Sequence, residues 1–87
     1  MPVYVDDMYK IPMGKFRNMK MSHMIADTTD ELLEMCDKIG VNRRWIQAPG
    51  TPEEHFDVSM SKRLAAIKHG AIPIGMRELS KMIKDRL

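Results

Sequence analysis

This sequence contains one cysteine, no long apolar run and only a small excess of one charge. The single cysteine, Cys36, cannot form an internal disulfide bond or build a thiolate cage around a metal. No stretch approaches the roughly 18 to 20 consecutive apolar residues that a membrane-spanning helix needs. Residues 1–7 lack the basic start and the apolar run of a signal peptide. We therefore expect a cytoplasmic protein that does not enter a membrane.

The charge balance and the size exclude further classes of protein. Fourteen Lys and Arg residues against 12 Asp and Glu residues leave a formal net charge of +2, too small for a general nucleic-acid coat. Glycine-rich phosphate loops of the Walker or dinucleotide type are absent. With 87 residues, 44% hydrophobic and 30% charged, the chain has room for one core, so we expect a single domain over residues 1–87. A core this small, with no disulfide, also makes a homodimer a reasonable expectation.

Three short apolar runs predict β-strands. Residues 2–5 are β-branched and aromatic, and residues 41–47 place Val, Trp and Ile around a polar centre. Residues 71–74 contain Pro73, which lacks the amide hydrogen of a central strand and therefore favours a sheet edge. Residues 8–21 have no clear period and predict a basic loop, with room for a short strand near its end.

Local capping signals predict two helices. The first begins at the capping box of Thr28 to Glu31 and ends at Gly40, with apolar residues along one face. The second is capped by Ser59 or Ser61 and runs to His69. Both predictions depend only on residues close together in the sequence.

The order of the elements predicts the fold class. A third helix covers residues 76–87, where apolar residues recur at helical spacing. Strands alternating with helices favour an α/β fold: a small three-stranded, mostly parallel sheet with three covering helices, a Rossmann-like mini-domain. Ligands bind such sheets beyond the carboxyl ends of the strands, where loops and helix N-termini meet.

Polar side chains gather at these expected strand ends. Asp6 and Asp7 follow the first strand, and Gln47 ends the second. A carboxylate in this place can hold Mg²⁺ or another divalent metal. The same acids can instead shape a turn by accepting backbone hydrogen bonds. Asp6 and Asp7 are therefore candidate metal ligands, with turn formation as the alternative.

Two of the three histidines have neighbours suited to chemistry. His55 and Asp57 can share one face of a strand, and His23 lies just before the first helix. Imidazole titrates near neutral pH and binds transition metals, so these three side chains are candidate acids, bases or metal ligands. Their spacing matches no zinc motif, and a structural role is the alternative. His69 fits a helix C-terminus, and Cys36 fits a buried, inert thiol.

Cationic side chains are candidate contacts for an anionic ligand. Lys62 and Arg63 begin the second helix, where the helix dipole does not favour a cation. The ten methionines fit either a flexibly packed core or a surface that binds a partner. The basic loop could bind phosphate or single-stranded nucleic acid, or simply be solvated, through Lys10, Lys15, Phe16, Arg17 and Lys20.

Five separated segments resemble one protein family: VYVDDM, SHMIAD, ELLEMCDKIGVNRRWIQ, HFDVSMSKRLAAIKHGAIP and MREL. Together they are similar to the domain of unknown function 4031 family of small bacterial and phage domains, over residues 3–79. The resemblance implies no particular activity. It implies that the family pattern includes Tyr4, Asp6, Asp7, Ser22, His23, Asp27, Trp45, Gln47, His55, Asp57, Lys62, Arg63, Arg77 and Glu78.

Two positions depart from that family pattern. Relatives have a Trp where this chain has Met21 and a Tyr where it has Phe56. If the Tyr hydroxyl acts in the relatives, this chain lacks that group.

The leading functional hypothesis is a small phosphate- or nucleotide-binding domain or a metal-assisted phosphoester enzyme. Its catalytic group would comprise Asp6, Asp7, His23, His55 and Asp57. Its ligand contacts would come from Ser22, Asp27, Gln47, Lys62, Arg63 and Arg77. The alternatives are a non-enzymatic, phage-encoded protein that modulates a host protein, and a single-stranded nucleic-acid binder. An active site predicts that Asp6, His23, His55 and Asp57 converge in one cleft.

Overall fold

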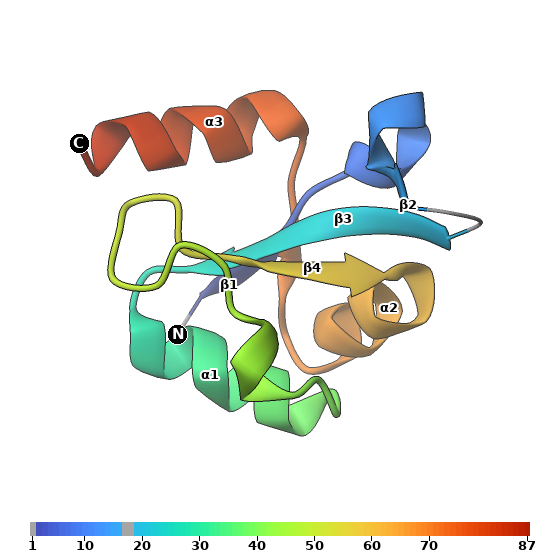
Figure 1. Ribbon diagram of the computed structural model, residues 1–87, viewed down its shortest axis with the longest axis horizontal. Helices are drawn as coiled ribbons and strands as arrows, with labels where there is room; N and C mark the ends of the chain where they lie inside the picture. Colours follow the sequence, from blue (N-terminus) through green and yellow to red (C-terminus); the bar gives the residue numbers. More distant parts are fainter. Residues whose placement is uncertain (1, 17–18) are drawn as a thin grey trace.

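A mixed β-sheet forms the centre of the computed structural model, which describes residues 2–16 and 19–87. Its four main strands follow the order β4-β3-β1-β5, and a two-residue strand, β2, pairs with the start of β3. Among the described strands only β1 and β5 pair in parallel, and the other pairings are antiparallel. The strands are β1 (Val3–Val5), β2 (Lys15–Phe16), β3 (Met19–Ala26), β4 (Phe56–Ser59) and β5 (Ile72–Pro73) (Figure 1).

The predicted three-stranded, mostly parallel sheet is wrong, although the protein is a small α/β domain. No strand forms over residues 41–47, because Asn42 Oδ1 accepts a hydrogen bond from Arg44 N (3.0 Å) and begins the short 3-10 helix η3 (Arg43–Trp45). Instead β3 begins near the end of the basic loop, where a short strand was considered, and extends through residues 22–26, which were expected to be a loop before the first helix. Its polar residues interrupt the apolar pattern because successive side chains point to opposite faces of the sheet.

The three expected helices are confirmed, with ends that match the local signals. Thr28 Oγ1 accepts a hydrogen bond from Glu31 N (3.2 Å), and Ser59 caps the second helix in the same way. Gly40 has φ +74°, a left-handed conformation that glycine adopts without a steric penalty and that ends the first helix. The helices are α1 (Thr29–Lys38), α2 (Met60–Lys68) and α3 (Met76–Asp85).

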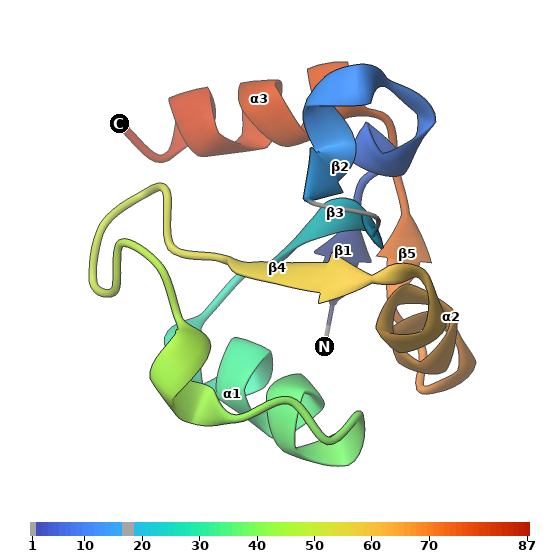
Figure 2. The same ribbon diagram turned by 45° about the vertical axis from the view of Figure 1, so that its right-hand side comes forward.

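The helices divide between the two faces of the sheet. Figures 1 and 2 show α1 and α2 on one face and α3 across the other. The main hydrophobic core lies between the sheet and the first two helices, and it buries Met24, Phe56 and Leu32 almost completely. Side chains that alternate with these residues, such as His23 of β3 and Asp57 of β4, therefore project to the α3 side. This side also carries the 3-10 helices η1 (Met8–Lys10) and η2 (Pro12–Gly14).

Smaller expectations can be compared directly with the structure. Pro73 lies in the edge strand β5, opposite Val5, as its missing amide hydrogen indicated. Cys36 is buried, and burial raises the pKa of its thiol.

Arg17 of the basic loop and the side chain of Phe16 lie outside the described residues. Within the part of the chain that the structure describes, no helix combines the length and the apolar character needed to cross a membrane.

Candidate functional site

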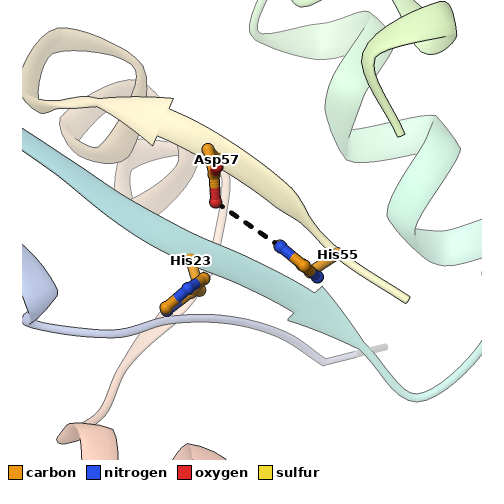
Figure 3. A group of neighbouring side chains, drawn as sticks. All are labelled: His23, His55 and Asp57. Atoms are coloured by element: carbon orange, nitrogen blue, oxygen red, sulfur yellow. Dashed lines mark ion pairs between the residues drawn. The ribbon is translucent and has the colours of Figure 1, made fainter. Parts of the chain in front are cut away.

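Two histidines and an aspartate meet on the α3 side of the sheet. His23 of β3 and Asp57 of β4 are paired directly across the two strands, and His55 lies two residues before Asp57 on the same face (Figure 3). One ligand atom from each side chain lies within 4.8 Å of the other two. The two imidazole rings meet edge to face with their centres 5.2 Å apart, and His55 Nε2 is 3.5 Å from Asp57 Oδ1. We call these three residues the His/Asp cluster.

Each imidazole of the cluster has one nitrogen fixed by the surrounding chain. His55 Nδ1 lies 2.6 Å from the carbonyl oxygen of Glu53, which can only accept, so Nδ1 donates and Nε2 is the nitrogen left for a ligand. His23 Nδ1 is 2.6 Å from Asp6 Oδ2, which likewise makes Nε2 the nitrogen left for a ligand. Histidines that bind a metal through one ring nitrogen usually donate a hydrogen bond from the other, because that hydrogen bond sets the tautomer and the ring orientation.

Asp6 is the buried carboxylate that organises this side of the cluster. Its Oδ1 accepts hydrogen bonds from His23 N (2.8 Å) and Met8 N (3.1 Å), while Oδ2 faces the His23 ring. Burial by itself favours the neutral acid, but these hydrogen bonds outweigh it and leave the pKa of Asp6 below its ordinary value. The hydrogen bond to Asp6 in turn raises the pKa of His23, against a smaller opposing effect of burial. Asp6 thus positions His23 and does not itself join the cluster.

Gln47 performs the corresponding task for Asp57. Its Nε2 donates to Asp57 Oδ2 over 2.7 Å, and its backbone forms a two-bond bridge with His55. Asp57 Oδ1 is the oxygen nearer the cluster, at the 3.5 Å distance from His55. Every member of the cluster is therefore held by a neighbouring group, which reduces the entropy lost when a ligand binds.

Two other residues expected at the site have structural partners. Asp7 Oδ1 accepts a hydrogen bond from Met76 N (3.1 Å) at the first residue of α3, so it anchors that helix. Arg63 is buried, donates from Nε to the backbone oxygen of Asp6 (2.9 Å) and stacks over the ring of Tyr9. Both residues fix the turn that carries Asp6, and neither belongs to the His/Asp cluster.

The remaining predicted ligand contacts are dispersed. Ser22 is buried, and its Oγ has no hydrogen-bond partner among the described residues. Lys62 Nζ donates to the carbonyl oxygen of Ile39 (2.8 Å), whereas Asp27 and Arg77 are exposed outside the cluster. The structure therefore brings together His23, His55 and Asp57, with Asp6 and Gln47 behind them, and does not add the expected cations.

Two pockets adjoin the cluster. The first, of about 330 Å³, has His23 and His55 in its wall and is closed by Leu79 and Ile83 of α3. The residue of this helix expected at the site was Arg77, which is exposed outside the cluster, whereas Leu79 and Ile83 share one face of the helix through their helical spacing. The second pocket, of about 560 Å³, reaches the cluster at Asp57. We call it the Trp45 pocket; its wall comprises Met8, Met13, Gly14, Lys15, Met21, Trp45, Gln47 and Asp57.

The departures from the family pattern lie on opposite sides of the sheet. Phe56 is fully buried on the core side of β4, so a hydroxyl on this ring would point away from the His/Asp cluster. Met21 lies on the other side, in the wall of the Trp45 pocket.

The three described lysines of the basic loop, Lys10, Lys15 and Lys20, surround a separate depression of about 380 Å³.

Comparisons with known proteins identify the family but not an activity. Searches of curated proteins and of solved structures each returned no match. The model of the family described as "Protein of unknown function (DUF4031)" matches residues 3–86, almost the whole chain and all the residues of the site. The chain therefore belongs to the DUF4031 family.

Proposed function

We propose that this protein is a metal-dependent hydrolase whose divalent transition metal is held by His23, His55 and Asp57. The observation that carries the proposal is the convergence of these three side chains within 4.8 Å, each fixed by a neighbouring group. Two imidazoles and one carboxylate suit Zn²⁺ or Fe²⁺, whereas Mg²⁺ prefers oxygen ligands. The proposal therefore places the metal at the His/Asp cluster, with Asp6 as a supporting group, and not at Asp6 and Asp7 themselves.

Three protein ligands leave a coordination position for water. A bound Zn²⁺ lowers the pKa of such a water to about 7, which makes it a nucleophile at neutral pH. The reaction we propose is hydrolysis of a phosphoester: the water oxygen bonds to phosphorus and the ester P–O bond breaks. The leaving oxygen takes up the proton that the water loses. The two pockets that adjoin the cluster would give a small substrate access to this position.

Metal binding is tested by titrating the metal-free protein with Zn²⁺ in a calorimeter and with Co²⁺ in a spectrophotometer. We expect one ion per chain, and at least about a tenfold loss of affinity in each of His23→Ala, His55→Ala and Asp57→Ala. His69→Ala is the matched control, because His69 is an exposed histidine at the end of α2. Equal affinity in His55→Ala and His69→Ala would refute the site.

Hydrolysis is tested separately with the Zn²⁺-loaded protein and p-nitrophenyl phosphate, a generic phosphomonoester. We expect release of p-nitrophenol that His55→Ala abolishes and His69→Ala retains. A protein that binds Zn²⁺ at the cluster yet hydrolyses no phosphoester would keep the metal site and overturn the proposed reaction.

A further inference from the structure

The Trp45 pocket has an unusually apolar and exposed wall. Trp45 is 61% exposed and Met13 69% exposed, although large apolar side chains are normally covered. Met8 and Met21 complete this side of the pocket. Thioethers and an indole ring are well suited to contact a flat aromatic ring, because methionine adapts its shape and sulfur makes favourable contacts with aromatic rings.

The pocket also has a polar side with a defined pattern of charge. Lys15 is the one lysine in the wall, and Arg44, which is not part of the wall, has its guanidinium 4.8 Å from the centre of the Trp45 ring. Gln47 uses its Nε2 to hold Asp57, so its Oε1 stays available to accept a hydrogen bond from a ligand. The wall thus combines one cation, Lys15, with one carboxylate, Asp57. Lys15 complements an anionic group, and the Gln47 acceptor complements a ring that carries N–H groups.

Asp57 connects this pocket to the His/Asp cluster, because it belongs to both. A molecule that filled the pocket would therefore have one end beside the metal ligands. The volume of about 560 Å³ falls in the range of pockets that bind small organic ligands, about 300 to 1,000 Å³.

We propose that the Trp45 pocket binds the substrate, and that the substrate joins a flat, nitrogen-containing aromatic ring to an anionic group, as a nucleoside monophosphate does. The ring lies against Trp45 and the methionines, and the anionic group lies between Lys15 and the cluster. This inference deepens the proposed function and rests on it for the chemistry. Binding of the ring by itself requires no metal, so the two proposals can fail separately.

The test uses calorimetry on the metal-free protein with three probes: adenosine monophosphate, adenosine and ribose 5-phosphate. We expect the monophosphate to bind more tightly than either part. Trp45→Ala should weaken binding of the monophosphate and of adenosine by about tenfold or more, as loss of base stacking does. Lys15→Ala should weaken the monophosphate about fivefold or more and leave adenosine unchanged, since exposed charges act on the anionic group alone. Lys68→Ala, an exposed lysine on α2, is the matched control for charge.

The outcomes separate this inference from the metal site. Equal binding of adenosine monophosphate to wild type and Trp45→Ala would overturn the inference, as would no binding at millimolar concentrations. Either result leaves Zn²⁺ binding to be judged by its own titration. Conversely, if adenosine binds through Trp45 but His55→Ala binds Zn²⁺ as well as wild type does, the pocket stands and the proposed metal site fails. Circular dichroism of each variant checks that it is folded.

Discussion

Asp6 shows how one buried carboxylate can serve a site without belonging to it. Three hydrogen bonds reach it, from the amides of Met8 and His23 and from the ring of His23, and its own carbonyl is held by Arg63. A buried charge with this many partners is stable, but removal of the charge leaves the partners unmatched. The consequences extend to His23 because its ring orientation depends on the same carboxylate.

Asp6→Asn should therefore affect both the stability of the protein and the proposed metal binding. We expect a loss of about 1–3 kcal/mol in the free energy of unfolding, since a charged acceptor is replaced by a neutral amide. Affinity for Zn²⁺ should fall about 10- to 100-fold, as it does when the hydrogen-bond partners of metal-binding histidines are removed. Urea unfolding and calorimetric titration measure the two effects. Asp7→Asn is the control: its carboxylate contacts α3, so Zn²⁺ affinity should stay close to wild type.

The same pair makes the stability of the metal-free protein depend on pH. The pKa of His23 is raised from its ordinary value of 6.5, so the stabilisation is complete below 6.5 and is lost as the pH rises through the raised pKa. The pKa of Asp6 is lowered from 3.8, so its contribution is present above 3.8 and is lost as the pH falls through the lowered pKa. The pair should therefore stabilise the protein most between these ordinary values, from pH 3.8 to 6.5.

We expect His23→Gln to cost more free energy of unfolding at pH 5.5 than at pH 8.5, measured by urea unfolding in the presence of EDTA. The comparison of wild type with variant at each pH removes the contributions of all other titrating groups. A cost that is larger at pH 8.5 would show that the ion pair of Asp6 and His23 does not form.

At the scale of elements, the short 3-10 helices depend on one glycine. Gly14 ends η2 and packs on η1, and a Cβ atom added there would lie 2.0 Å from the backbone oxygen of Met8. Backbone atoms cannot move aside as a flexible side chain can. The close approach of these two helices, which shapes one wall of the Trp45 pocket, therefore requires glycine.

Gly14→Ala should destabilise the protein by about 2 kcal/mol or more, because the two 3-10 helices must separate to relieve the clash. Gly75→Ala is the matched control, since the added Cβ would meet no atom within 4 Å and Gly75 has φ −84°. It should cost less than about 1 kcal/mol, the order of a changed helix N-cap. Thermal or urea unfolding of both variants makes the comparison, and equal effects would contradict the packing of η1 on η2.

Individual elements also show which sequence patterns are informative. Helices α1 and α2 could be predicted because Thr28 and Ser59 cap them through residues only three positions away. The prediction of a strand at residues 41–47 was wrong, because the Asn42 side chain favours a 3-10 turn over extended backbone. Most of strand β3 was not predicted, because polar residues interrupt the apolar pattern that marks a strand. Of these polar residues, Ser22 is buried and His23 belongs to the site.

For the whole molecule, metal binding should stabilise the folded state by mass action. The cluster unites β3 with β4, which are distant in the sequence, so unfolding destroys it. At a free Zn²⁺ concentration about 100 times the Kd, the expected stabilisation is about 2.7 kcal/mol. In a domain of this size that corresponds to a rise in Tm of about 10–20 °C.

Scanning calorimetry of wild type and His55→Ala with and without Zn²⁺ measures this effect. The variant should show little or no rise in Tm, whereas His69→Ala should respond as wild type does. A similar rise in wild type and His55→Ala would locate the stabilising ion away from the cluster.

Five separated motifs by themselves identified the family. The sequence also determined the three helices and the edge position of Pro73, and it singled out His23 and His55, which the structure brings together. Each follows from local signals: caps, helical spacing, a missing amide hydrogen, and imidazole chemistry. The tertiary structure alone decided that the sheet is mostly antiparallel, that Asp6 supports His23, and that α3 and Trp45 form the walls of pockets at the site. These features depend on strand register and on contacts between segments far apart in the chain, which no local pattern specifies.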